Sequence, residues 1–249
     1  NLAEVARFLG KRDDAVRLDA WADRIARRFN EEFFDAASGI YHGENPTPYR
    51  QAANVVPLEY GLVPEVDSAR VLGSLLRDLD GTRDRIGTGF VGTLSMMELM
   101  PRIDPERAYR LATQPDYPGW GFMALSGATT MWEHWDGLKA DGSMWSKDMN
   151  SFNHYAYGAV GEWMFNVCAG INPDEENPGF RRIHFRPLTD ERMGYVKASI
   201  RTERGVVGSQ WRYMDDGSVR YTFTVPAGCT ADAEIEGQVI EMNEGVHTF

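Results

Sequence analysis

Apolar residues in the first 170 positions recur with the period of a helix. Segments 2–9 and 16–29 place them at i, i+3 and i+4, the spacing of one buried helix face. Asp104 followed by Pro105 is a strong start signal, because aspartate caps a first turn and proline fits the first helical position. We expect about seven helices, the others lying over 48–64, 67–79, 88–103, 104–114 and 151–170.

The period changes to two from about residue 180, where short runs rich in β-branched and aromatic residues begin. Turn signals such as "DDG" (215–217) and "PAG" (226–228) separate these runs. This pattern predicts a small antiparallel β-sandwich of about 70 residues. The polar segment "INPDEENPGF" (171–180) is the expected linker. The predicted strands lie within 181–188, 194–214, 218–226, 229–235 and 237–242.

Helices followed by strands predict two domains, a helical one over 1–172 and a β-sandwich over 180–249. The helical hairpins show no strict sequence repeat, which argues against a simple solenoid. Hairpins arranged in a ring would instead form an α/α barrel, whose helix ends and loops line a deep bowl. The helices expected here fill only part of such a ring, so we predict an apolar seam and a missing N-terminal part.

Composition and charge narrow the classes of partner. The chain has 249 residues and a formal net charge of −11, which argues against a nucleic-acid surface. No run of about 18 apolar residues exists, so no membrane span is expected. The sequence shows no targeting segment and does not indicate a compartment.

No metal or cofactor is expected from the sequence. The five histidines are scattered, and Cys168 and Cys229 lack the spacing of a metal site. The motif "GTGFVG" (87–92) fits G-x-G-x-x-G, but no β-strand is predicted before it. We interpret it as a turn that opens a helix.

The stretch "GATTMWEHWDG" (127–137) places charges among large apolar side chains. Glu133 stands beside Trp132, and Trp135 follows two positions later. A partly desolvated carboxyl group suits acid–base chemistry, whereas the simpler alternative is a solvated glutamate in a loop. A concave site that grips a polyhydroxylated, partly apolar ligand would use both the carboxylate and the indoles.

A second polar and aromatic stretch is "SMWSKDMNSFNHYAYG" (143–158), which contains Asn153 and His154. His154 is expected at the start of the long helix, either as a ligand contact or as a histidine bonded to backbone, and Asn153 belongs to the predicted substrate-binding set. Four tryptophans fall between positions 120 and 145. Each alone favours a core position, but together they favour at least one sugar-stacking platform. The four are Trp120, Trp132, Trp135 and Trp145.

Four tracts together resemble the C-terminal half of bacterial α-L-rhamnosidases of glycoside hydrolase family 78. The resemblance runs from near residue 1 to about residue 235 and is most specific over 114–187. In order, the tracts are "TGFVGT", "ATQPDYPGWGFMALSGATTMWEHWDG", "MNSFNHYAYGAVGEWMFNVCAGINPD" and "PGFRRIHFRP".

The resemblance implies an (α/α)6 barrel followed by a β-sandwich, and inverting hydrolysis of terminal α-L-rhamnosyl linkages. The substrate would be a rhamnose-containing oligosaccharide or glycoside. The resemblance also assigns Glu133 as the general base and His154 as a rhamnose contact. Family members often have arginine after that glutamate, whereas this chain has His134, a departure that changes the surroundings of the base without removing it.

Inverting hydrolysis needs two carboxyl groups about 6.5–9.5 Å apart, with the attacking water beside the base. The resemblance places the general acid in the first half of the barrel, and no matching Asp- and Arg-rich segment is found here. We therefore expect the fragment to be inactive without its missing N-terminal half. The alternatives are another glycosidase or lyase on the same barrel acting on a different sugar, and a non-catalytic carbohydrate-binding protein.

Overall fold

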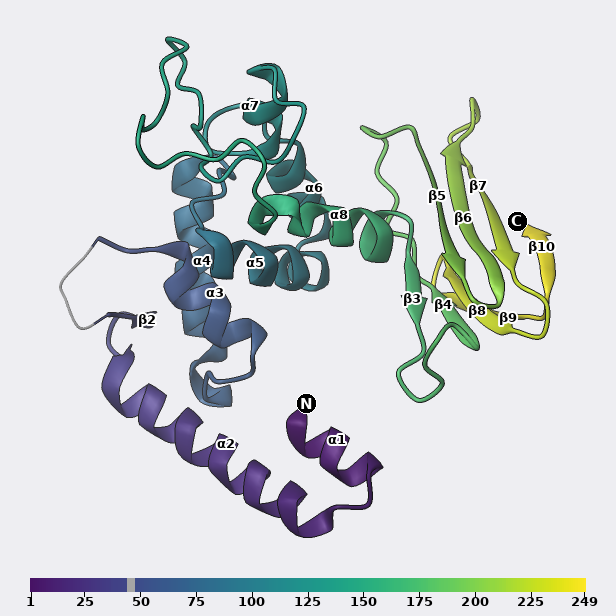
Figure 1. Ribbon diagram of the computed structural model, residues 1–249, viewed down its shortest axis with the longest axis horizontal. Coiled ribbons are helices and arrows are strands. Elements are labelled where there is room, and N and C mark those ends of the chain that lie inside the picture. Colours follow the sequence, from purple (N-terminus) through teal and green to yellow (C-terminus); the bar gives the residue numbers. More distant parts are fainter. Residues whose placement is uncertain (44–47) are drawn as a thin grey trace. The chain divides into compact units, whose positions relative to one another are not determined.

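The computed structural model describes residues 1–43 and 48–249 (Figure 1). These residues form two compact units. The first unit is Asn1–Leu99 and the second is Met100–Phe249. The second unit contains the later helices together with all the strands of the predicted sandwich. Within the described ranges, no helix is long and apolar enough to cross a membrane.

The described part of the first unit is helical, with a short β-hairpin. Pro57 lies inside helix α3 and Pro64 precedes helix α4, so the segment 48–64 is not one helix ended by Pro64. Its elements are α1 (Leu2–Phe8), α2 (Arg12–Phe33), β1 (Phe34–Asp35), β2 (Ile40–Tyr41), α3 (Gln51–Glu59), α4 (Glu65–Thr82) and the start of α5 (Phe90–Ile103).

A buried asparagine ties the elements of this unit together. The Asn54 side chain donates to the backbone carbonyls of Gly39 and Val71, at 3.1 and 3.0 Å, and accepts from the Tyr41 amide at 3.2 Å. The hairpin, α3 and α4 therefore share one fully buried polar group whose hydrogen bonds are satisfied, as burial of an amide requires.

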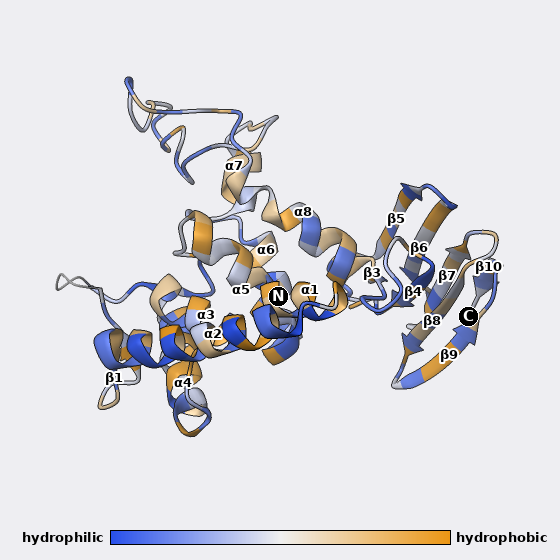
Figure 2. Ribbon diagram, turned by 60° about the horizontal axis from the view of Figure 1, so that its bottom comes forward, coloured by the Kyte–Doolittle hydropathy of each residue, from blue (hydrophilic) through white to orange (hydrophobic). Residues whose placement is uncertain are grey.

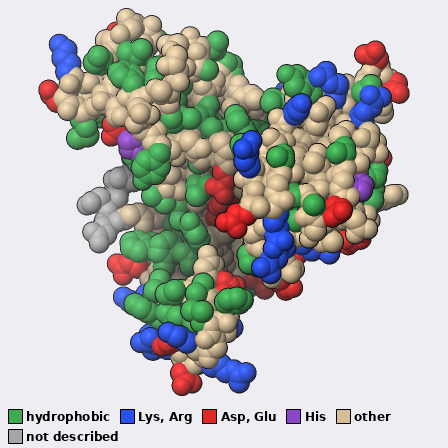
Figure 3. All heavy atoms as spheres, turned by 45° about the vertical axis from the view of Figure 1, so that its right-hand side comes forward, with side chains coloured by type: hydrophobic (Ala, Val, Ile, Leu, Met, Phe, Trp, Pro, Cys, Tyr) green, Lys and Arg blue, Asp and Glu red, His purple; other side chains and the backbone are tan. Residues whose placement is uncertain are grey.

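Large apolar side chains remain exposed along α1 and α2. Figure 2 shows hydrophobic and hydrophilic residues interspersed along α2, and Figure 3 shows hydrophobic side chains at the surface of this lower helical part. Such a surface agrees with the apolar seam expected of an incomplete ring of helices. The exposed residues are Leu2, Val5, Phe8, Leu9, Val16, Trp21 and Ile25.

In the second unit, α6 confirms the predicted start signal. Asp104 is the N-cap, and its carboxylate accepts a hydrogen bond from the Arg107 amide at 2.9 Å. The helix expected over 151–170 begins later than predicted, because residues 151–154 form backbone hydrogen bonds with another loop. The helical elements here are α6 (Pro105–Thr113), α7 (Trp120–Leu125), η1 (Ala156–Gly158), α8 (Ala159–Trp163) and η2 (Met164–Cys168).

Two four-stranded sheets form the sandwich. The predicted linker 171–180 begins with a strand, β3, which pairs with β4. All strand pairs are antiparallel except β4 with β8. One sheet has the order β3 (Ile171–Pro173), β4 (Arg182–Phe185), β8 (Thr230–Ile235), β9 (Gln238–Met242). The other has the order β10 (Gly245–Thr248), β7 (Val219–Val225), β6 (Gly205–Tyr213), β5 (Tyr195–Thr202).

Both sheets contribute side chains to one apolar core. Phe185 from β4 stacks on Phe223 from β7, with ring centroids 4.5 Å apart. Trp211 on β6 is fully buried, and its indole Nε1 donates to the Cys168 carbonyl at 2.6 Å. The Ser209 hydroxyl donates to the next carbonyl, that of Ala169, at 2.5 Å. These two bonds satisfy carbonyls at the end of η2 that would otherwise lack a partner.

A charged network lies around Asp232 of β8, which is 2% exposed. His184 Nδ1 lies 2.7 Å from the Asp232 carboxylate, Arg182 lies 3.2 Å from it, and Arg186 forms an ion pair with it. Burial acts to raise the pKa of Asp232, but the interactions of its carboxylate with Arg186 and His184 outweigh burial and lower the pKa below the ordinary value of 3.8. Asp174, near His184 and Arg182, and Glu234 and Glu241 complete the network.

We expect Asp232→Asn to destabilise the β-sandwich by about 1–3 kcal/mol at pH 7, because the arginines lose their central carboxylate. Since the pKa of Asp232 is lower in the folded chain, its contribution is complete above about pH 4 and decreases as the pH falls through the folded pKa. Urea unfolding at pH 7 and pH 3 measures both effects. The gap between wild type and variant should narrow at pH 3, and an equal gap at both values would contradict the assignment.

Candidate active site

Two loop segments that are distant in the sequence lie side by side around Glu133 and His154. The Glu133 amide donates to the Ser151 carbonyl at 2.8 Å, and the His154 amide donates to the Met131 carbonyl at 2.8 Å. The Thr130 hydroxyl adds a bond to the Phe152 carbonyl. These hydrogen bonds hold Glu133 and His154, the two residues that the sequence predicts most strongly for the site, on two neighbouring loop segments.

Three of the tryptophans form a buried frame for this loop. Trp120, Trp132 and Trp135 are 9%, 3% and 7% exposed. Trp120 meets Trp135 edge-on at 5.1 Å, and Trp135 stacks on Tyr157 at 3.8 Å. The Trp120 indole also donates to the Tyr157 carbonyl at 2.8 Å. The frame holds the loop in place through packing and one buried hydrogen bond.

Trp132 fixes the chain on the other side of Glu133. Its ring meets Phe152 edge-on, with centroids 5.5 Å apart. A Cβ atom added at Gly137 would lie 3.1 Å from the Trp132 ring and 3.3 Å from Phe152, so only glycine lets the backbone pass this close without displacing a ring. The tight packing explains why a glycine follows "WEHWD" in the sequence.

Glu133 and His154 are both half-buried. Across the described part of the chain, the Glu133 carboxylate accepts no hydrogen bond and forms no ion pair. His154 Nδ1 accepts from the Ala156 amide at 3.3 Å, and its ring lies parallel to that of Tyr155 with centroids 5.3 Å apart. Asn153 is exposed, and its backbone amide donates to the Ser151 hydroxyl at 3.2 Å.

Sequence reasoning gave less weight to two aromatic neighbours of this loop. Tyr157 lies beneath Trp135, and burial raises the pKa of its phenol to about 12, with Tyr117 and Asp136 adding to the effect. Tyr155, beside His154, is largely exposed. The signal that could have indicated both is the run "NHYAYG", in which aromatic residues alternate with small ones after the histidine. Among the residues that the structure describes, no group of three His, Cys, Asp or Glu side chains could hold a metal ion.

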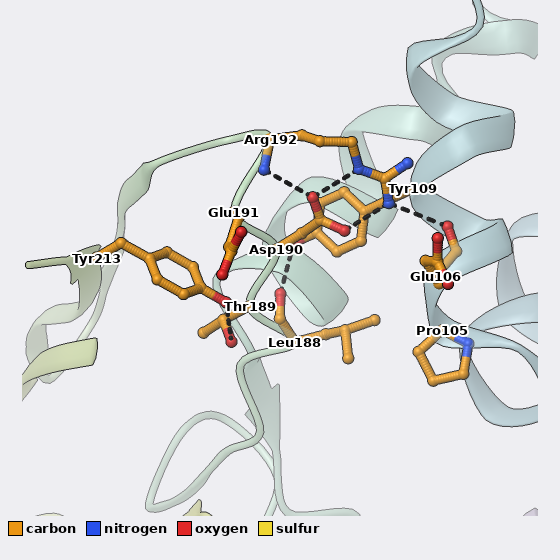
Figure 4. A pocket seen from close by; sticks show the side chains of 9 residues that line it. All are labelled: Pro105, Glu106, Tyr109, Leu188, Thr189, Asp190, Glu191, Arg192 and Tyr213. Atoms are coloured by element: carbon orange, nitrogen blue, oxygen red, sulfur yellow. Dashed lines mark hydrogen bonds and ion pairs between the residues drawn. The ribbon is translucent and has the colours of Figure 1, made fainter. Parts of the chain in front are cut away.

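A cavity of about 550 Å³ lies elsewhere in the second unit, between the start of α6 and the segment that follows β4 (Figure 4). Its polar groups mostly bind one another. Arg192 pairs with Asp190 and donates to the Glu106 carbonyl at 3.2 Å, and the Tyr109 hydroxyl donates to the Leu188 carbonyl at 2.5 Å. No predicted site residue lines it. We therefore interpret the cavity as a space left where α6 packs beside the sandwich.

Helical hairpins followed by a β-sandwich are the architecture that the family resemblance implies for a helical-hairpin glycosidase. Family models agree with this class along almost the whole chain. Residues 1–168 match the bacterial α-L-rhamnosidase 6 hairpin glycosidase domain, and residues 170–248 match the bacterial α-L-rhamnosidase C-terminal domain. The chain therefore belongs to the bacterial α-L-rhamnosidase family.

Individual relatives agree with the family match. An α-L-rhamnosidase of Streptomyces avermitilis is 34% identical over 94% of this chain, and one of Alteromonas sp. is 28% identical over 92%. These matches cover 22% and 24% of the two relatives, so the chain spans about a quarter of their length.

Solved structures show the same fold. The Streptomyces avermitilis α-L-rhamnosidase complexed with L-rhamnose superposes with a TM-score of 0.87 and 30% identity, covering 99% of this chain and 25% of that one. The α-L-rhamnosidase of Dictyoglumus thermophilum gives a TM-score of 0.84 and 27% identity, covering 99% of this chain and 30% of that one. The prediction of a partial helical barrel followed by a β-sandwich is thereby confirmed.

Proposed function

We propose that this chain supplies the C-terminal part of an inverting α-L-rhamnosidase, with Glu133 as its general base. The observation that carries the proposal is the pairing of the Glu133 and His154 segments over a buried tryptophan frame. The family match and the L-rhamnose complex of the Streptomyces relative support the sugar. A rhamnose-containing oligosaccharide or glycoside is the substrate under this proposal.

Glu133 has the features that a base for water activation requires. Its backbone is held by the Ser151 carbonyl, while its carboxylate makes no internal hydrogen bond or ion pair with the described residues. A positioned carboxylate that is not engaged elsewhere is able to accept a proton from water as the water attacks the anomeric carbon. As the water oxygen bonds to C1, the bond from C1 to the leaving oxygen breaks, the general acid gives that oxygen a proton, and the configuration at C1 inverts.

The remaining predicted residues have binding roles in this proposal. His154 and Asn153 supply polar groups to the sugar hydroxyls next to the base. Three buried tryptophans chiefly fix the loop, namely Trp120, Trp132 and Trp135. Their ring edges are the parts available for contact with the sugar.

The general acid lies outside this chain in the proposed mechanism. The acidic pairs considered from the sequence, Asp13–Asp14, Glu31–Glu32 and Asp78–Asp80, belong to helices α2 and α4. An inverting enzyme needs its acid on the opposite side of the sugar from the base. We therefore expect the chain alone to be inactive, and the missing N-terminal half of the barrel to be the partner that completes the site.

The test uses the longer protein that carries this sequence and the aryl glycosides of α-L-rhamnose, glucose, mannose and fucose. We expect selective cleavage of the rhamnoside, and NMR should show the inverted anomer of the sugar forming first. Selective cleavage of another sugar would favour a different barrel glycosidase or lyase. Binding of rhamnosides without any turnover would favour a carbohydrate-binding protein. First release of the retained anomer would overturn the inverting mechanism.

A further inference from the structure

Trp145 differs from the other three tryptophans near Glu133. Its side chain is 41% exposed, whereas Trp120, Trp132 and Trp135 are all at or below 9%. A stacking platform has to offer an open ring face to its ligand. Among these four tryptophans, Trp145 is therefore the one whose exposure suits a platform.

The exposed ring of Trp145 is held in one orientation. Its indole stacks on the imidazole of His134, with ring centroids 3.8 Å apart and an interplanar angle of 18°. One face of the indole is thus covered by His134, and its exposure comes from the opposite face and the edges. The Trp145 amide donates to the Gly137 carbonyl at 3.2 Å, and a bridge between Leu138 and Met144 closes the intervening turn.

His134 connects this platform to the candidate base. It follows Glu133 in the chain, and its carbonyl accepts from the Gly137 amide at 3.1 Å. The Nε2 atom of His134 is buried and makes no hydrogen bond with the described residues. Stacking on Trp145 is therefore the ring contact that orients the imidazole.

We infer that the open face of Trp145 stacks on a pyranose or aromatic ring of the substrate, and that His134 is its positioning residue. The inference rests on the proposed function. Sugars present an apolar face of C–H groups, which an indole covers well while hydroxyl groups at the ring edge remain hydrated. The ligand ring is either the rhamnose itself or the ring to which rhamnose is attached, and both use the same contact.

The experiment measures KM and kcat of the longer protein with methyl α-L-rhamnoside, an aryl rhamnoside and a rhamnosyl-glucose disaccharide. We expect Trp145→Ala to raise KM about tenfold with kcat changed by less than about twofold. Trp145→Phe should retain most of the affinity, because it retains a ring. Met149→Ala removes another exposed apolar side chain of the same loop and should behave as wild type.

His134 is tested by its own pair of variants. His134→Ala should raise KM, as Trp145→Ala does. His134→Phe should restore the wild-type KM, because a flat ring again supports the indole. Loss of affinity in both His134 variants would contradict a positioning role through stacking.

The substrates separate the two possible rings. A rise in KM for all three substrates, with weaker inhibition by free L-rhamnose, supports stacking on rhamnose. A rise confined to the aryl glycoside and the disaccharide supports stacking on the next ring. Equal KM values for Trp145→Ala and Met149→Ala on every substrate would overturn the inference.

Failure of the proposed function is recognised separately. Calorimetric binding of L-rhamnose and of the disaccharide to Glu133→Gln, with and without Trp145→Ala, measures the platform without turnover. A wild-type protein that hydrolyses no rhamnoside would overturn the proposed function alone. Unchanged calorimetric affinity for both ligands on removal of the Trp145 ring would overturn the platform alone.

Discussion

Replacement of Glu133 by glutamine in the longer protein should lower kcat for p-nitrophenyl α-L-rhamnoside by about 10²–10⁴-fold. Glutamine keeps the size of the side chain but cannot take a proton from water. The substitution breaks no internal hydrogen bond or ion pair, because the described residues make none with the Glu133 carboxylate. The melting temperature should therefore stay close to that of wild type while the rate collapses.

The matched control is Asp148→Asn, which neutralises an exposed carboxylate of the same loop. It should retain the wild-type rate, so that a loss in Glu133→Gln is not a general effect of removing negative charge. Normal turnover by Glu133→Gln would mean that this glutamate only positions sugar or packs against Trp132, and the proposed base would have to be abandoned.

The second large effect is expected at Trp211, in the centre of the sandwich. Trp211→Ala should destabilise the second unit by about 3–5 kcal/mol, because it empties a fully buried indole site between the two sheets. Trp211→Phe fills most of the volume but leaves the Cys168 carbonyl without the indole donor, which we expect to cost about 1–3 kcal/mol. Urea unfolding followed by circular dichroism gives both values.

Trp21→Ala is the corresponding control, since Trp21 is an exposed tryptophan on α2. Its effect should stay within about 0.5 kcal/mol. A Trp211→Ala chain as stable as Trp21→Ala would show that the sheets close over the vacated space, contrary to the packing described.

Sequence signals predicted those elements that are determined by residues close together in the chain. Asp104 and Pro105 mark the start of α6 because a cap and a first-turn proline act within four residues. The alternation in "SVRYTFTV" predicts β7, whose alternate residues Tyr221, Phe223 and Val225 enter the core. The helical hairpins predicted an α/α barrel, and the family resemblance added its six-hairpin form and the role of general base for Glu133.

Long-range pairing explains what the sequence pattern missed. Residues 151–154 have helix-compatible spacing, but the amide of His154 and the carbonyl of Ser151 bond to the 131–133 segment instead. No local pattern records such a partner. In the same way, the spacing of the tryptophans does not predict which indole is buried. The exposure of Trp145, in contrast to the three buried tryptophans, depends on the turn that the bridge between Leu138 and Met144 closes.

The pairing of β3 with β4 has a practical consequence for dividing this protein. A β domain cut at residue 180 would lose β3, and β4 would become an edge strand with unpaired amide and carbonyl groups. Open edges of this kind recruit strands from other molecules and promote aggregation. The same cut would remove the Cys168 and Ala169 carbonyls that receive Trp211 and Ser209. A soluble version of the isolated sandwich should therefore begin before Cys168, inside the last helical turn.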